Sequence, residues 1–434
     1  MKIKIISFLF ASIFAFSSLF VNIVKANEVK IGVLLPLTGP VAQIGLDAKA
    51  AIETAVDIIN NKTDLNIPLA KTEGLPGLKG AKIKVVIVDH QGKPEIGQGE
   101  AERLINNEKV HALFGAYFSA VTGTASLVAE RAGIPFVNGS SSSPALTERG
   151  LKYFFRVSPH DGQFTKLMFD FLDEFQKKKN IKISSASILH EDSAFGTDSA
   201  TTQEKFINDK KYKLLDKITY NAKATSLSSE VQKLKASNAD LLLPSSYTAD
   251  TYLFLKTAKE LDYNPKMLLA QNAGYTDPAF VSTAGKDAEG AITRSPYNDD
   301  LAKRIPNLSK VNELFKKKSN GRDLSDVPAR EFTAFMVLAD AINRAGSTNP
   351  DKIRDALVKT NIPAKDLIVP YEGVRFDAKG QNELQRGILM QVQNGKYCTI
   401  YPFAFAACEV KYPMPTWAQK KKVIIFKKLR GGFN

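Results

Sequence analysis

The feature that most constrains the fold is a regular alternation of strand-like and helix-like segments over residues 28–274. Residues 28–35 are apolar and predict a buried strand, and apolar residues at helical spacing predict a helix over 46–62. Further strands are expected at 81–90, 110–115 and 134–139, with helices at 93–109 and 119–133. Such alternation is typical of a parallel sheet whose strands are joined by right-handed crossovers.

The same pattern starts again after residue 158. Strands are expected at 184–192, 213–221, 239–246 and 265–274, separated by helices at 160–178, 196–210, 226–238 and 249–263. Two such runs predict an α/β protein with two doubly wound parallel-sheet lobes rather than one large sheet. The region 305–360 is expected to be mainly helical, and short strands follow it.

The N-terminus has the composition of a secretory signal peptide. Lys2 and Lys4 precede an apolar stretch from Ile5 to Phe20, and Val24-Lys25-Ala26 predicts cleavage after Ala26. An uncleaved membrane anchor is the alternative, but the apolar core is shorter than the ~20 residues of a membrane span. No cysteine stands in a lipobox position, so in a bacterium with two membranes the mature chain is expected to be free in the periplasm.

The two cysteines and the basic charge bear on the same compartment. Cys398 and Cys408 lie close together, and an oxidising compartment favours a disulfide between them, with two reduced buried thiols as the alternative. The formal net charge is +14, much of it in lysine runs such as 177–182 and 316–318. Solvated surfaces explain these runs better than nucleic acid, because exported chains rarely meet it and no aromatic-studded basic motif is present. No metal-ligand set is visible.

Six loops follow predicted strands and share one composition. Each carries Ser, Thr, Tyr, Gln or Asn beside Gly or Pro; they are residues 36–45, 115–123, 138–147, 190–198, 244–250 and 270–277. In open parallel sheets, ligands bind outside the carboxyl ends of the strands. Small residues let backbone amides approach a ligand closely, and amides at helix starts favour anionic groups such as a carboxylate.

These loops resemble those of a known family. GPVAQIG at 39–45, GIPFVNGSSSSPALTERG at 133–150, HEDSAFG at 190–196 and AGKDAEG at 284–290 occur in the order seen in the leucine/isoleucine/valine-binding proteins. These are type I periplasmic substrate-binding proteins of ABC transporters for branched-chain amino acids. The resemblance covers nearly the whole mature chain, and the order and spacing of the motifs carry it.

The resemblance implies two lobes joined by three crossovers, near Arg156–Ser158, Ile292–Ser295 and Gly373–Arg375. Lobe I would comprise residues 27–157 and 296–373, and lobe II residues 158–295 and 374–417. Residues 1–26 would be the signal peptide and 418–434 a basic C-terminal tail, for which the sequence suggests no role.

Three serines match family positions that hold the carboxylate of the ligand. Ser119 matches a serine whose hydroxyl binds it, and Ser141 and Ser142 match a pair whose amide and hydroxyl share that task. Turn formation and helix capping are the alternative roles, since serine performs both commonly. The two roles are compatible.

Aromatic residues are expected to cover the ligand. Phe195 and Tyr247 match aromatic positions on two loops of lobe II, whereas Ile44 stands where the family often has a larger aromatic. That replacement would enlarge or reshape the side-chain pocket. Tyr275 also follows a strand and is expected near the ligand, and Tyr117 either lines the cleft or packs in the core.

One position departs from the family. Amino-acid binders place an acidic residue for the ligand ammonium where this chain has Asn272. A buried, unpaired ammonium is costly. Either another acid reaches the site, with Asp161, Glu191 and Asp192 as candidates, or the solute is a different carboxylic acid or amide.

The sequence therefore predicts a binding protein rather than an enzyme. The histidines, His90, His111, His160 and His190, stand beside no GxSxG elbow, HExxH helix or phosphate-binding loop. The expected function is solute capture for an ABC importer, by a monomer without a cofactor that docks on an inner-membrane permease. A sensor module that reports to a signalling partner is the alternative.

Overall fold

The computed structural model describes residues 28–421, and its first body is built on a parallel five-stranded sheet in the order β2-β1-β3-β4-β5. The strands are β1 (Val29–Leu35), β2 (Ile83–Asp89), β3 (Ala112–Gly115), β4 (Phe136–Asn138) and β5 (Phe154–Arg156). β1 lies between β2 and β3, and six of its seven residues are buried, as expected for an apolar strand covered on both faces. β5 was not predicted as a strand.

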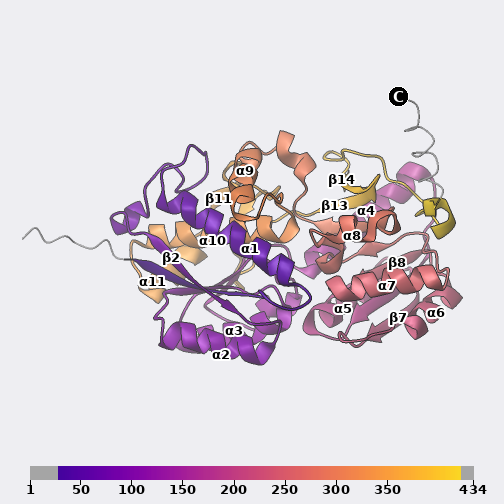
Figure 1. Ribbon diagram of the computed structural model, residues 1–434, viewed down its shortest axis with the longest axis horizontal. Coiled ribbons are helices and arrows are strands. Elements are labelled where there is room, and N and C mark those ends of the chain that lie inside the picture. Colours follow the sequence, from indigo (N-terminus) through magenta and orange to yellow (C-terminus); the bar gives the residue numbers. More distant parts are fainter. Residues whose placement is uncertain (1–27, 422–434) are drawn as a thin grey trace, which may run out of the picture.

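Helices cover both faces of this sheet. On one face α2 (Pro94–Asn106) packs on α3 (Ser119–Ala132), and on the other α1 (Ala42–Asn60) packs on α9 (Leu308–Lys318) and α10 (Asp326–Ala345) (Figure 1). α11 (Pro350–Val358) packs on α10. The late helices α9, α10 and α11 therefore pack in the same body as the N-terminal sheet.

The second body contains two smaller sheets joined edge to edge. A parallel sheet, β7-β6-β8, is made of β6 (Ser185–Glu191), β7 (Lys213–Tyr220) and β8 (Leu241–Ser245). A bridge from Leu242 to Leu268 joins it to the sheet β14-β13-β10-β9. The latter consists of β9 (Leu269–Ala270), β10 (Ile292–Ser295), β13 (Ile388–Gln393) and β14 (Lys396–Tyr401), and β13 runs antiparallel to β10. This confirms the α/β class, with an antiparallel hairpin added at the edge of the second sheet.

The helices of the second body are α4 (Asp161–Lys179), α5 (Ala194–Asp209), α6 (Ser228–Ser237), α7 (Thr248–Glu260) and α8 (Phe280–Ala284). The two bodies lie beside each other along the long axis of the molecule (Figure 1). We call them lobe I and lobe II, in the order of the chain.

The chain passes between the lobes near Arg156 and Arg294, at the ends of β5 and β10. The third passage lies after β12 (Gly373–Val374), which pairs with β11 (Ile362–Pro363) of lobe I. Asn382 still donates to the carbonyl of Val157 (3.1 Å). Residues 374–382 therefore contact lobe I before the chain enters β13.

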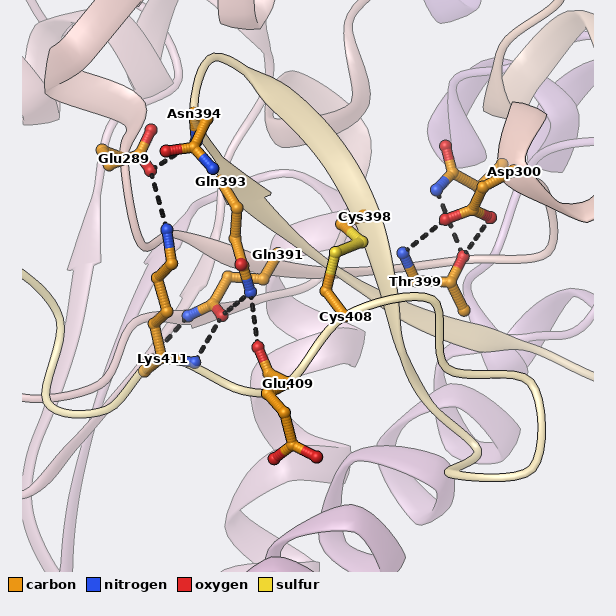
Figure 2. The surroundings of a disulfide bond; sticks show 11 residues. Glu289, Asp300, Gln391, Gln393, Asn394, Cys398, Thr399, Cys408, Glu409 and Lys411 are labelled. Atoms are coloured by element: carbon orange, nitrogen blue, oxygen red, sulfur yellow. Dashed lines mark hydrogen bonds and ion pairs between the residues drawn. A yellow bond between two sulfur atoms is a disulfide. The ribbon is translucent and has the colours of Figure 1, made fainter.

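A disulfide between Cys398 and Cys408 confirms the predicted pairing. It holds the segment after β14 against the β13–β14 hairpin, where Gln391 exchanges two hydrogen bonds with the backbone of Lys411 and Gln393 donates to the carbonyl of Glu409 (Figure 2). The segment therefore behaves as part of lobe II.

The predicted signal peptide, residues 1–26, lies outside the described residues, as does most of the predicted basic tail. The described part ends in a helical turn at 417–421, where Trp417 is buried and donates from its indole nitrogen to the carbonyl of Tyr263 (2.7 Å). Within residues 28–421, no helix has both the length and the apolar character needed to cross a membrane.

Candidate functional site

The serine loop, Ser140–Ser143, follows β4 and is completely buried between the lobes. Each of its carbonyl oxygens accepts a hydrogen bond from a buried group. Arg330 donates to Ser140, Arg156 donates to Ser141 and Ser143, and the amide of Asp161 donates to Ser142. The backbone amides of Ser141 and Ser142 meet no acceptor among residues 28–421. The loop is therefore held by hydrogen bonds to its carbonyl oxygens, while the backbone amides of Ser141 and Ser142 remain available to a ligand.

The serine hydroxyls do not all have the same role. Ser141 Oγ lies 2.6 Å from Thr122 Oγ1 and donates to the carbonyl of Tyr117 (3.0 Å). Ser142 Oγ accepts from Arg294 (3.3 Å), and Ser119 Oγ accepts from the amide of Ser143 (3.3 Å). The structure brings the three predicted carboxylate-binding serines together around one turn of the backbone.

The two outer serines of the loop, Ser140 and Ser143, also make long-range contacts. Ser140 Oγ donates to Glu331 on α10, and Ser143 Oγ donates to Asp198 on α5. Because Asp198 belongs to lobe II, the second bond joins the lobes directly.

A cluster of aromatic rings lies at the lobe interface beside this loop. Tyr117 and Phe118, after β3 of lobe I, approach Tyr247 of lobe II with ring centroids 6.0 and 4.7 Å away. Phe195 lies 5.1 Å from Tyr247. The structure therefore brings together three of the predicted aromatic residues, Tyr117, Phe195 and Tyr247, and adds Phe118.

Ile44 and Tyr275 lie elsewhere than in this ring cluster. Ile44 is on α1 and is buried in the apolar core of lobe I. Tyr275 packs on Phe280 (5.4 Å between centroids) in the lobe II core, and its hydroxyl has no partner among the described residues.

Asn272, after β9, contacts an acid from the opposite lobe. Its Nδ2 donates to Asp326 Oδ2 at 2.5 Å, where Asp326 begins α10. Asp326 also accepts from Arg330 (2.6 Å) and Ser295 (2.8 Å). A carboxylate is therefore present beside this position, but lobe I supplies it.

The three acids considered as ammonium partners are already engaged. Asp161 accepts from Arg294 (2.5 Å) and Ser199 (2.6 Å). Glu191 accepts from the amides at the start of α5, and Asp192 is exposed and accepts from Asn221. Of these, Asp161 bonds to the serine loop itself, through its amide to the carbonyl of Ser142, and its carboxylate partner Arg294 also bonds to Ser142.

Burial dominates the electrostatics of this region. It raises the pKa of Asp161, against the opposing charge of Arg294. It lowers the pKa of Arg294 to about 10 and that of Arg156 to about 9. For Arg330, burial lowers the pKa, but the charge and hydrogen bond of Asp326 together with Tyr371 and Glu331 outweigh burial, and the pKa is raised. All three guanidinium groups therefore stay protonated at neutral pH.

The functional candidates that sequence reasoning missed are Arg294, Arg330 and Asp326. Their signal was present: Arg294 interrupts the apolar segment AITRS, and Arg330 and Asp326 are charges in the otherwise apolar start of a core helix. Of the three, Asp326 lines a cavity of about 540 Å³ between the lobes, with Tyr297 and Tyr397 also in its wall. That volume is in the usual range for small-molecule sites.

Two sheet-containing lobes that enclose polar loops from both sides define a class of protein that captures a solute between its lobes. The chain belongs to the periplasmic binding protein family, whose model matches residues 28–396. This is a family of solute-binding proteins and not of enzymes.

Relatives and solved structures agree with this assignment. A Leu/Ile/Val-binding protein homolog 7 from Brucella abortus is 29% identical over 401 residues, covering 89% of this chain and 94% of its own. The fold matches a leucine-binding protein, LivK, from Thermotoga maritima, with a TM-score of 0.73, 22% identity, and 86% and 97% of the two chains covered. It also matches LivJ from Streptococcus pneumoniae in complex with isoleucine (TM-score 0.71, 20% identity, 89% and 100% covered).

Proposed function

We propose that this protein is the exported solute-binding component of an ABC importer and that it captures a small carboxylate-bearing solute between its lobes. The observation that carries the proposal is the serine loop. The carbonyls of Ser140, Ser141 and Ser143 accept hydrogen bonds from buried arginines, and the amides of Ser141 and Ser142 have no acceptor among residues 28–421. Amides presented in this way suit a carboxylate oxygen.

Contacts across the lobe interface support capture by closure. Ser143 bonds to Asp198, Asn272 bonds to Asp326, and Phe118 packs on Tyr247. A solute that contacts both lobes adds to these bonds only in the closed form, and so it shifts the population toward that form. The closed form is then what the permease recognises. The names of the relatives are consistent with this role.

A thermal-shift screen of the mature protein against amino acids, oxo acids, aromatic acids and amides tests the proposal. The natural solute raises the melting temperature by mass action. Ser142→Ala should then weaken its binding about tenfold, as expected for one lost hydrogen bond to a charged group. Ser282→Ala, an exposed serine on α8, is the control and should leave affinity unchanged. Unchanged affinity in Ser142→Ala would show that the serine loop is not the site.

A further inference from the structure

The open amides of the serine loop share their peptide groups with carbonyls that buried arginines hold. The amide of Ser141 belongs to the same peptide group as the carbonyl of Ser140, and the amide of Ser142 to the same group as the carbonyl of Ser141. The peptide bonds of this loop are trans. In a planar trans peptide group the C=O and N–H bonds point in opposite directions. A side chain that holds the oxygen therefore also fixes the direction of the N–H.

Arg330 of α10 holds the first of these peptide groups. Its Nη1 donates to the carbonyl of Ser140 (2.8 Å), and the hydroxyl of the same serine donates to the neighbouring Glu331. Arg330 is 1% exposed, so water competes little for this bond. A charged donor on the carbonyl also polarises the peptide group and makes its N–H a better donor. Arg330 thus aims and strengthens the Ser141 amide without needing a contact with the solute.

Arg156 of β5 holds the second peptide group. Its Nη1 donates to the carbonyl of Ser141 (3.3 Å) as well as to that of Ser143 (2.6 Å). Its other nitrogens donate to Gln381 (2.6 Å) and Thr147 (2.9 Å). Thr147 lies in the turn that follows the serine loop, and Gln381 belongs to the segment that contacts lobe I. The second open amide is therefore oriented by contacts that do not involve the helices of lobe II.

Arg330 differs from Arg156 because its other contact is linked to lobe II. Its Nη2 donates to Asp326 Oδ2 (2.6 Å), one helical turn earlier on α10. The same oxygen accepts from Nδ2 of Asn272 in lobe II (2.5 Å). A continuous series of hydrogen bonds therefore runs from Asn272 to the carbonyl of Ser140. A bond of this length across the interface requires the lobes to be closed, so closure completes the contacts that hold Arg330.

We propose that Arg330 is a positioning residue of the solute site, because it aims the Ser141 amide at the carboxylate of the solute. Asn272 acts on the solute through Asp326 and Arg330, and not by direct contact. The inference rests on the proposed function and gives a role to the amide at position 272. Because closure and solute binding share the Arg330 contacts, each favours the other.

A double-mutant cycle measured by calorimetry on the mature protein tests this series of bonds. The probes are leucine, isoleucine, valine, phenylalanine and 4-methyl-2-oxopentanoate, and the one that binds most tightly is used for all variants. Arg330→Lys keeps the charge but loses the forked geometry that joins Asp326 to Ser140, and it should weaken binding about tenfold. Asn272→Gly removes the side-chain amide and tolerates the positive φ of 42°. It should weaken binding about fivefold.

The double variant distinguishes an indirect role of Asn272 from a direct one. Because Asn272 acts through Arg330, Arg330→Lys combined with Asn272→Gly should bind only about tenfold more weakly than the unmodified protein. Arg156→Lys is the matched control, since Arg156 also holds carbonyls of the loop but makes no bond in series with Asn272. The losses of Arg156→Lys and Asn272→Gly should multiply.

Losses that multiply in the Arg330 cycle as well, or unchanged affinity in Arg330→Lys, would overturn the inference and leave the proposed function standing. If no probe binds, both fail. The melting temperature of each free variant separates folding from binding. If Arg330→Lys does not fold, Asp326→Asn replaces it in the cycle, because it removes the charge that holds Arg330. The double variant with Asn272→Gly should then bind no more weakly than the weaker single variant, and a further loss would overturn the inference.

Discussion

The contact between Asn272 and Asp326 suggests a reason why this chain has an amide at the position where the amino-acid binders of the family have an acid. Asn272→Asp places a second carboxylate against Asp326, whose oxygen lies 2.5 Å from Nδ2 in the structure. Asn272 is 4% exposed, so water screens the pair little. Asparagine and aspartate both tolerate the positive φ of 42° at this position, so the substitution changes charge without adding backbone strain.

The magnitude follows from three contributions. Two carboxylates about 4 Å apart repel by about 4 kcal/mol at an effective dielectric constant of about 20. The Arg330 guanidinium, 2.6 Å from Asp326, attracts the new carboxylate by about 3 kcal/mol at roughly 6 Å. The lost hydrogen bond to a charged acceptor adds about 2 kcal/mol. The free energy of unfolding of the variant should therefore be about 3 kcal/mol lower than that of the unmodified protein at neutral pH.

The stability loss in Asn272→Asp should increase with pH. Repulsion raises the pKa of the new carboxyl in the folded, closed protein above its ordinary value of about 3.9. Below about pH 3.9 the new carboxyl is protonated in both the folded and the unfolded protein, so the repulsion costs no stability. The loss of stability grows as the pH rises through the raised pKa. The protonated form can also donate to Asp326 and so restore the bond.

Thermal unfolding and small-angle scattering at pH 5 and pH 8 check this prediction. At pH 8 the variant should melt about 4 °C below the unmodified protein, or adopt a more open form with a larger radius of gyration. At pH 5 the difference should shrink. The double variant Asn272→Asp with Asp326→Asn keeps one carboxylate and one amide, and it should recover most of the loss. Equal melting temperature and radius at both pH values would refute the reasoning.

Two further predictions concern other buried features. Removing the disulfide with Cys398→Ser and Cys408→Ser should lower the free energy of unfolding by about 2.7 kcal/mol, the chain-entropy value for a sequence separation of 10. Chemical denaturation should therefore show a lower midpoint. An unchanged midpoint would mean that the β13–β14 hairpin holds residues 408–411 without the disulfide. Glu331 is fully buried, and burial raises its pKa to about 7. The free energy of unfolding should therefore fall by about 3 kcal/mol as the pH rises from about 4.5 through 7, and Glu331→Gln should remove this pH dependence. A pH dependence that persists in the variant would assign it to another group.

Much of the fold was predictable because it depends on local pattern. Apolar runs such as β1 and β6 and the helices between strands have periodicities that the sequence displays directly. β5 and β10 were harder, since each is short and carries a fully buried arginine, Arg156 or Arg294, which no strand pattern favours. These strands acquire their form from pairing with β4 and β9.

The candidate site was also predictable only in part from the sequence. Loops after parallel strands converge by a general rule, which selected the loops, and the resemblance to the family selected Ser119, Ser141, Ser142, Phe195 and Tyr247 within them. The rule specifies which loops meet and does not specify which side chains in them are already bonded. Asp161 and Glu191, predicted as possible ammonium partners, already accept hydrogen bonds from Arg294 and from the amide of Gly196, respectively.

The sequence by itself determined the α/β class, the two lobes, the pairing of Cys398 with Cys408 and the serine loop as the place to look. The tertiary structure decided the charge of the cleft. Asp326 and Arg330 lie on α10, far along the chain from Asn272 and from the serine loop, and the return of that helix to lobe I places them there. Contacts between distant segments have no local signature in a single sequence, because burial and partner choice arise only when the lobes pack.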